Sequence, residues 1–309
     1  GGTLQIGNGG TAGSLGSGAV INNATLIFNR SDNLLVGNNI SGSGRLIQAG
    51  TGTTILTGTN TYSNVTLINS GVLQVGNGGA SGTLGTGNIT NSAALVFNRS
   101  DALTVPNLIT GTGALTQIGP GTLELTRDNS YAGGTIVSNG TLLVNNTTGY
   151  GTGSGAVTVV AGATLGGTGA VATLTLQSGA VLAPGSSPGT LTVNTLTMNA
   201  GSTNLIEITS PGLEAGTYDV VKGSSVTFAG VLSLAFSGGT YTNGSTVQVY
   251  DYTTYTNNFD AVVWSGLPGS QQATFDPLTG YVTVIPEPGP VALVGGGLAL
   301  LVVLRRRRK

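Results

Sequence analysis

Carboxylates are the side chains of this chain that could do acid–base or metal chemistry. The sequence has eleven Asp and Glu residues but neither histidine nor cysteine. That composition removes Ser-His-Asp triads, thiol nucleophiles and the commonest metal ligands. Clustered carboxylates can still cleave polysaccharides, but positions 1–200 carry only Asp32, Asp101, Glu124 and Asp128. We therefore expect a non-enzymatic protein with no catalytic residue, no metal site and no cofactor.

Two of these carboxylates occupy equivalent positions of an internal repeat, which we call the long repeat. Its full units are 2–70 and 71–139, a partial third copy begins at residue 140, and segment 28–32 returns as 97–101. If one coil of chain uses about 20 to 25 residues, a unit makes about three coils, which places Asp32 and Asp101 about 14 Å apart. That distance is too long for one shared metal or water. We expect the two carboxylates to pair with Arg30 and Arg99, or to cap turns, instead.

Aromatic residues near the C-terminus form a second candidate site. Tyr250, Tyr252, Tyr255 and Trp264 could present a platform on which sugar rings stack, and an extracellular polysaccharide would then be the partner. The alternative, which we favour, is that these rings fill the core of a C-terminal cap.

Strands must position all of these residues, and the repeat predicts how the strands stack. Apolar residues alternate with polar ones at Leu4/Ile6, Leu26/Phe28 and Leu73/Val75, which puts them on one face of a strand. Helix-forming residues are scarce, while Gly and Asn separate the apolar pairs. We predict an all-β chain in which residues 1–203 form a β-solenoid whose parallel coils bury a continuous aliphatic column.

Residues 204–284 differ from the repeats in both period and composition. They lose the period of the long repeat and hold six of the nine tyrosines and the single tryptophan. We predict an antiparallel β cap over the last coil, with segment 276–280 as a hairpin loop, because a solenoid end must be covered. A separate β-sandwich domain is the alternative.

The C-terminal residues have the order of a membrane segment. Pro286, Glu287 and Pro288 precede an uncharged run at 290–304, and the chain then ends in a basic cluster, Arg305, Arg306, Arg307, Arg308 and Lys309. A helix over 290–304 is short but able to span a membrane, and the basic cluster favours the cytoplasmic side. The chain before Pro286 is then an ectodomain. One interpretation of this segment is an ordinary single-span membrane anchor; the alternative, a sorting signal, rests on a resemblance to a known family.

This order of segments resembles the PEP-CTERM sorting signal of Gram-negative bacteria over residues 285–309. The resemblance implies that an exosortase-type membrane protease recognises Pro286-Glu287-Pro288, cleaves near it and releases the ectodomain toward the cell surface or the exterior. The implied location is the bacterial cell envelope, with membrane insertion through the C-terminal helix before processing.

A second resemblance covers approximately positions 1–200. Segments 50–62 and 119–131 are similar to the autotransporter-associated β-strand repeat of bacterial passenger regions, and 183–191, with Pro184 and Pro188, looks like a loop typical of such proteins. That family's fold is a right-handed parallel β-helix. The resemblance implies a passenger-like rod, and we expect no membrane barrel of its own after residue 205.

The distribution of charge limits the classes of molecule that the chain is expected to bind. Up to Pro288 the chain has five basic and eleven acidic residues, a formal charge of −6. Phosphate binding needs clustered cations, so a nucleic-acid partner is not expected. We interpret the chain as an exported surface or extracellular-matrix protein of scaffold or adhesion type, and a polysaccharide-binding or polysaccharide-acting β-helix is the alternative.

Overall fold

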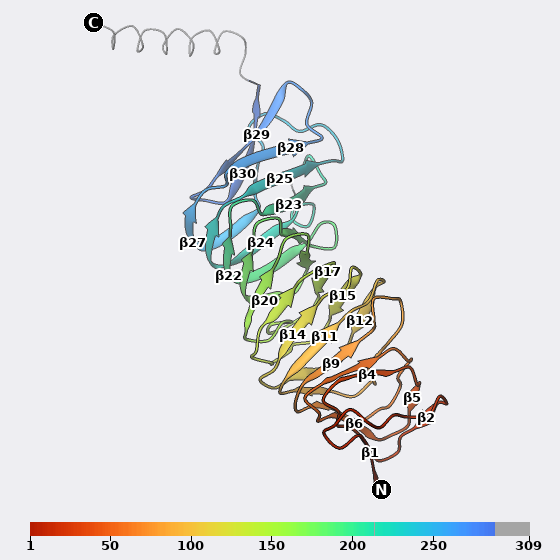
Figure 1. Cartoon of the computed structure of the whole chain (residues 1–309). Helices are drawn as coiled ribbons and strands as arrows, with labels where there is room; N and C mark the ends of the chain where they lie inside the picture. Colours follow the sequence, from red (N-terminus) through yellow and green to blue (C-terminus); the bar gives the residue numbers. More distant parts are fainter. Residues whose placement is uncertain (213, 288–309) are drawn as a thin grey trace, which may run out of the picture.

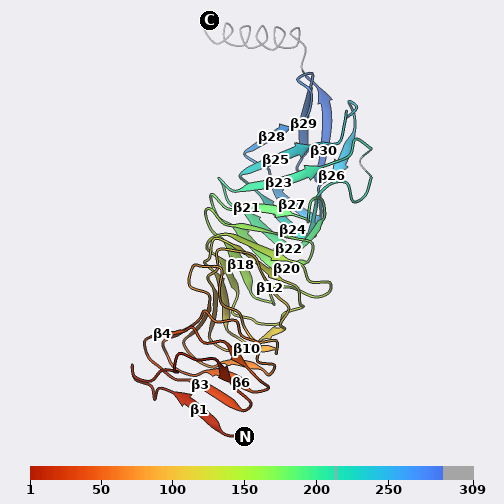
Figure 2. The ribbon, with the colours of Figure 1, turned by 90° about the vertical axis from the view of Figure 1, so that its right-hand side faces the viewer.

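The computed structural model describes residues 1–212 and 214–287, and these residues form a long stack of β coils (Figures 1 and 2). Three sheets of parallel strands run along the stack, and we name them sheets I, II and III. The described residues contain no helix. The predicted parallel β-solenoid is therefore confirmed for this part of the chain.

In each of the three sheets, the strands lie side by side in the order in which they occur along the chain. Sheet I consists of β1 (Thr3–Ile6), β3 (Thr25–Phe28), β6 (Arg45–Gln48), β8 (Thr66–Ile68), β10 (Ile89–Asn91) and β13 (Ile109–Thr110). Sheet II consists of β4 (Asn33–Val36), β7 (Thr53–Leu56), β9 (Val72–Val75), β11 (Ala94–Phe97), β14 (Ala114–Gln117), β16 (Thr135–Val137), β18 (Ala156–Val159), β20 (Ala170–Leu176), β22 (Thr190–Met198), β24 (Val220–Phe228) and β27 (Tyr250–Asn257).

Sheet III begins later in the chain. It consists of β12 (Leu103–Val105), β15 (Thr122–Leu125), β17 (Thr141–Val144), β19 (Thr164–Gly167), β21 (Val181–Pro184), β23 (Thr203–Ile208), β25 (Val231–Phe236) and β28 (Ala261–Ser265). A small parallel pair, β2 (Val20–Ile21) and β5 (Ile40–Ser41), lies beside the N-terminal coils.

The core is a column of aliphatic side chains between the sheets. Leu73, Leu95 and Leu115 are registered neighbours on sheet II, and all three are fully buried. Their neighbours along each strand point outward, because successive residues of a strand face opposite sides. The alternation read from the sequence therefore correctly assigned the inward positions.

The long repeat makes three coils and then one further segment that reaches the next sheet, which is slightly more than the expected about three coils. From β6 the chain returns to sheet I at β8, β10 and β13, and it then crosses to β14 in sheet II. β14, which starts at Ala114, is the repeat equivalent of β6, which starts at Arg45. Equivalent segments of successive repeats therefore lie on different sheets.

Asparagine side chains in segments without strands bond to the adjacent coils. The side chain of Asn60 accepts a hydrogen bond from the backbone N of Ile40 (2.9 Å) and donates one to the carbonyl O of Thr83 (2.7 Å). Its repeat equivalent, Asn129, bonds in the same way to Ile109 and Gly151. These side-chain bonds replace ladder hydrogen bonds between adjacent coils.

The antiparallel cap is smaller than we predicted. β23, β24, β25, β27 and β28 all continue the parallel sheets, so the parallel ladders reach Ser265 rather than ending at residue 203. Antiparallel pairing between strands is confined, in the described part of the chain, to β26 (Thr246–Gln248), β29 (Gln271–Asp276) and β30 (Tyr281–Pro286).

The period of the repeat is lost because the coils beyond residue 203 grow longer. On sheet III, Leu123 pairs with Leu142 in the next coil, whereas Thr203 pairs with Val231. The later coil therefore contains more residues than the earlier one, although both add one strand to the same sheet. A longer coil changes the spacing of the apolar residues in the sequence without ending the solenoid.

Aromatic side chains close the C-terminal end of the stack. The ring of Phe228 lies 4.8 Å from that of Phe259, 5.0 Å from that of Tyr250 and 5.2 Å from that of Phe275, measured between centroids. Phe275 comes from β29 of the small antiparallel sheet. The predicted hairpin at 276–280 joins β29 to β30, and the Asp276 side chain accepts hydrogen bonds from Leu278 and Thr279 inside it.

Candidate functional site

The structure places only part of the predicted sorting segment. Pro286 ends β30 and Glu287 follows it, and both residues are exposed. Pro288, the segment 290–304 and the basic cluster 305–309 lie outside the described residues. Within residues 1–212 and 214–287, none of the elements is a helix long and apolar enough to cross a membrane.

The four aromatic candidates are not gathered on one surface. Tyr250 and Tyr252 are buried in the core, and Tyr255 is half-buried with its hydroxyl accepting a hydrogen bond from the backbone N of Tyr252 (3.0 Å). Trp264 is 38% exposed and belongs to β28 of another sheet. The four rings therefore do not form a shared platform, and Tyr250 and Tyr252 belong to the core.

Asp32 and Asp101 form ion pairs with the arginines two positions before them. Arg99 donates two hydrogen bonds to the Asp101 carboxylate (2.8 and 2.6 Å) and one to the carbonyl O of Gly82 (2.5 Å). Arg30 makes the same contacts to Asp32 and Gly13. Hydrogen bonds from the arginines lower the pKa of both carboxyls.

These contacts give the ion pairs a structural role. The carbonyls that Arg30 and Arg99 bind belong to the glycine-rich loops 7–19 and 76–88, so each pair fixes a loop to the next coil. The two pairs follow strands of different sheets, β3 in sheet I and β11 in sheet II. They are therefore not one site.

A hollow on the outer face of sheet III is the site that we single out. Along one outward row, Leu143 of β17 registers with Gly166 of β19, and Gly166 registers with Ala183 of β21. The next ladder pairs Leu182 with Asn204, which brings Leu205 of β23 beside Ala183. A cavity of about 390 Å³ lies over this row, and Leu143, Ala183 and Leu205 are among the residues that line it.

Polar groups line one side of this sheet III hollow. They come from the loop 185–189, with Ser186 and Ser187 exposed, and from two carboxylates, Glu207 of β23 and Asp219 before β24. The Ser187 hydroxyl donates a hydrogen bond to Oε2 of Glu207. The hollow therefore combines an aliphatic wall with hydrogen-bonding groups.

Asp219 holds the polar side of the hollow in place. Its Oδ1 accepts a hydrogen bond from the backbone N of Gly189 (2.8 Å), and its Oδ2 accepts one from that of Glu207 (2.9 Å). The side chain is 1% exposed. Burial raises the pKa of Asp219 to about 6, although the two backbone donors act in the opposite direction. Asp219 thus connects three segments that are distant in sequence.

Gly185 is required by this arrangement. Its φ of +86° lies in the left-handed region, and a Cβ there would lie 2.5 Å from Oδ1 of Asp219. Sequence reasoning marked segment 183–191 as a typical loop but offered no reason to connect it with Glu207 or Asp219. A charged residue on the outward face of β23, at Glu207, was the signal that could have located the hollow.

The hollow can bind but is poorly arranged for catalysis. Asp219 is already bonded to two backbone donors, which leaves Glu207 as the carboxylate that can act on a ligand. Acid–base cleavage of a glycosidic bond uses two free carboxyl groups. The described residues also contain no group of three or more acidic side chains that could hold a metal ion.

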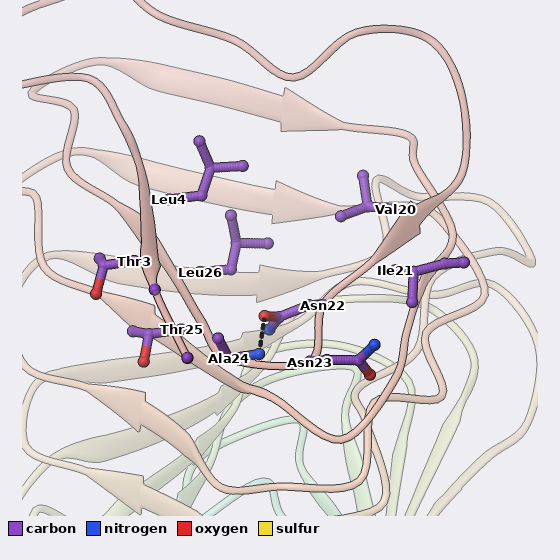
Figure 3. Close-up of a pocket in the computed structure, with 11 residues that line it drawn as sticks. Thr3, Leu4, Val20, Ile21, Asn22, Asn23, Ala24, Thr25 and Leu26 are labelled. Atoms are coloured by element: carbon purple, nitrogen blue, oxygen red, sulfur yellow. Dashed lines mark hydrogen bonds between the residues drawn. The ribbon is translucent and has the colours of Figure 1, made fainter.

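A larger cavity, of about 490 Å³, lies at the N-terminal end of the stack (Figure 3). Leu4 of β1, Leu26 of β3 and Val20 of β2 are among the residues that line it. β1 is the terminal strand of sheet I, so this cavity is the open end of the described coils. Its lining has no charged side chain that would select a ligand.

The fold defines a parallel β-solenoid, and parts of its repeats are similar to a family of passenger repeats. Residues 46–75 and 115–144 match the family described as Passenger-associated-transport-repeat. The two segments occupy equivalent positions of the long repeat and run over β6–β9 and β14–β17, that is, over different pairs of sheets.

A curated protein is similar to part of the chain. The "Adhesin BmaC autotransporter" of Brucella suis biovar 1 (strain 1330) is 42% identical over 88 residues, which is 28% of this chain and 3% of the adhesin. The chain therefore corresponds to a small share of that relative's length.

Proposed function

We propose that this chain is the rod of an exported bacterial surface protein that acts in adhesion or as a scaffold of the extracellular matrix. The observation that carries the proposal is the stack of parallel coils built from repeats that match a passenger family and resemble an adhesin. A solenoid gains length with each coil while its outward positions remain free to vary. Such a rod holds a contact surface away from the cell.

We further propose that residues 285–309 form a sorting signal of the PEP-CTERM type. The exposure of Pro286 and Glu287 at the end of β30 supports access by a membrane protease. Only the end of the ladder between β29 and β30 has to open there, where Pro286 pairs with Gln271 and the backbone N of Glu287 donates to the carbonyl O of Ser270. In this proposal the segment 290–304 inserts into the membrane, residues 305–309 stay on the cytoplasmic side, and the ectodomain is released to the cell surface or the exterior.

Deletion of residues 286–309 tests the sorting proposal. We expect the truncated chain to change its distribution among membrane, surface and medium fractions, and the intact chain to yield a mature C-terminus near Pro286 in mass spectrometry. A matched control replaces only Glu214, an exposed acid of the ectodomain, by Gln. Unchanged distribution and size after the deletion would refute sorting through this segment.

The adhesion role has its own test. Cells that export the chain should attach to a host-cell layer or to a matrix-coated surface more strongly than cells that lack it. Equal attachment of both strains, with the protein present at the surface, would contradict adhesion and leave the scaffold role.

A further inference from the structure

We propose that the sheet III hollow is a binding subsite for an uncharged hexopyranose unit of a polysaccharide. The proposal deepens the proposed adhesion function by naming the ligand class, and it rests on that function for its biological use. It starts from the residues that surround the hollow rather than from the aromatic residues of the cap.

The size and walls of the hollow fit one sugar ring. Its volume of about 390 Å³ lies in the range of small-molecule sites. Leu143, Ala183 and Leu205 give one side that is aliphatic, against which the C–H face of a pyranose can pack. The rest of the lining includes Ser186, Ser187 and Glu207, whose oxygens can bond to ring hydroxyls.

The free acceptor of the hollow is the second oxygen of Glu207. Oε2 accepts the hydrogen bond of Ser187, which fixes the orientation of the carboxylate. Among the described residues, no group donates a hydrogen bond to Oε1 of Glu207. A carboxylate oxygen that accepts from a hydroxyl makes a stronger hydrogen bond than a neutral acceptor does. We assign Oε1 to a sugar hydroxyl.

Charge limits the sugar to an uncharged one. The lining holds two acidic side chains, Glu207 and Asp219, and no basic one. A uronic acid would bring its carboxylate beside that of Glu207 without a compensating cation, and like charges at this distance repel. Glucose-like and N-acetylated hexoses lack that penalty.

The hollow is formed before any ligand arrives. Asp219 fixes the loop 185–189 to β23 through two backbone hydrogen bonds, and Gly185 lets the loop approach the carboxylate closely. A site whose groups are already ordered loses less conformational freedom on binding. Even a single ring can then bind with an affinity in the millimolar range.

The test uses the full chain in a detergent without a sugar headgroup. Saturation-transfer NMR and titration calorimetry would measure binding of glucose, galactose, mannose, N-acetylglucosamine and glucuronate at concentrations up to about 20 mM. We expect at least one uncharged sugar to bind and glucuronate to bind at least about tenfold more weakly.

Two variants and two matched controls locate the binding. Ala183→Leu places a larger side chain in the hollow and should weaken sugar binding at least about tenfold. Glu207→Gln removes the charged acceptor while keeping the shape of the side chain, and it should weaken binding at least about fivefold. Val181→Leu enlarges another outward residue of β21, and Asp251→Asn neutralises an exposed acid on β27 of sheet II. Both controls should bind like the unmodified chain.

Three outcomes would overturn the proposal: no uncharged sugar binds to the folded chain, binding survives in both hollow variants, or glucuronate binds as well as glucose. If Ala183→Leu loses its circular dichroism signal, Glu207→Gln alone decides. None of these outcomes bears on the fractionation or attachment tests, so failure of the subsite and failure of the proposed function are distinguishable.

Discussion

Phe28 and Phe97 occupy the same position of the long repeat but lie on different sheets of the solenoid. Phe28 ends β3 in sheet I and registers with Gln48, while Phe97 ends β11 in sheet II and registers with Gln117. Each phenylalanine thus pairs with the glutamine at the equivalent position of its own repeat, although the two pairs belong to different sheets. The repeat therefore follows a screw path, and equivalent loops point in different directions around the rod.

This screw path predicts that one whole repeat can be removed. Deletion of residues 71–139 places β17 on β7, where its equivalent β9 stacks in the intact chain. The coils should still pair, and the rod should shorten by about 16 Å, since about three and one-third coils are lost at about 4.8 Å each. Circular dichroism and small-angle X-ray scattering check this outcome.

The control deletes residues 71–130, which is nearly as long but out of register. It brings non-equivalent strands together and exposes inward leucines, so we expect loss of cooperative unfolding. Equal stability of the two deletions would show that the register is not fixed by the repeat.

Replacement of Arg99 by Ala should free the glycine-rich loop 76–88. The carbonyls of Gly82 and Ala80 lose their donor, and Asp101 loses its ion-pair partner. Hydrogen exchange in this loop should become about tenfold faster or more, while the core strands stay protected. Arg127→Ala, at an exposed arginine, is the control and should leave the loop unchanged.

A buried hydroxyl pair should contribute measurably to stability. The hydroxyl of Tyr62 lies 2.7 Å from Oγ1 of Thr66, and both residues are 1% exposed or less. Tyr62→Phe leaves Thr66 without this partner in the core, which should lower the free energy of unfolding by about 1–2 kcal/mol in urea denaturation.

Two further variants separate the hydrogen bond from packing. Tyr62→Phe combined with Thr66→Val removes both polar groups and should cost less than the two single changes added together. Tyr150→Phe, at a tyrosine that is 37% exposed, should have no measurable effect. Additive losses in the double variant would contradict a direct bond.

Asp219 should make the protein more stable as the pH falls from 7 to 5. Its pKa is about 6 in the folded chain, above the ordinary 3.8, so the folded state binds a proton in this window and the unfolded state does not. The gain should be about 1 kcal/mol. The chain has no histidine, which is the side chain whose ordinary pKa falls inside this window.

Urea denaturation at a series of pH values measures this gain. Asp219→Asn cannot titrate, so its stability should be nearly constant between pH 5 and 7, although lower overall because one backbone N–H loses its acceptor. Below about pH 4 both proteins should lose stability, because Asp32, Asp101 and Asp128 have lowered pKa values and become protonated. A parallel pH dependence in both proteins would exclude Asp219 as its source.

The local sequence was enough to predict the strands and what they bury. Alternation at Leu26/Phe28 and Leu73/Val75 identified the inward positions because the side chains of a strand alternate with a period of two. The turn at 276–280 followed from its Asp, Pro and Gly residues. The pairing of Arg30 with Asp32 was one of two structural roles expected for this carboxylate, and the other was to cap a turn.

The tertiary structure alone decided which sheet each repeat occupies and where the hollow forms. Thr3 pairs with Thr25, and Thr25 pairs with Arg45, so these two successive coils differ in length because their corner loops differ. The sum of such coil lengths, and not the repeat itself, determines which sheet a given repeat segment joins. Only this stacking brings Leu143, Ala183, Glu207 and Asp219 to one place, since residues distant in sequence become neighbours through coil geometry.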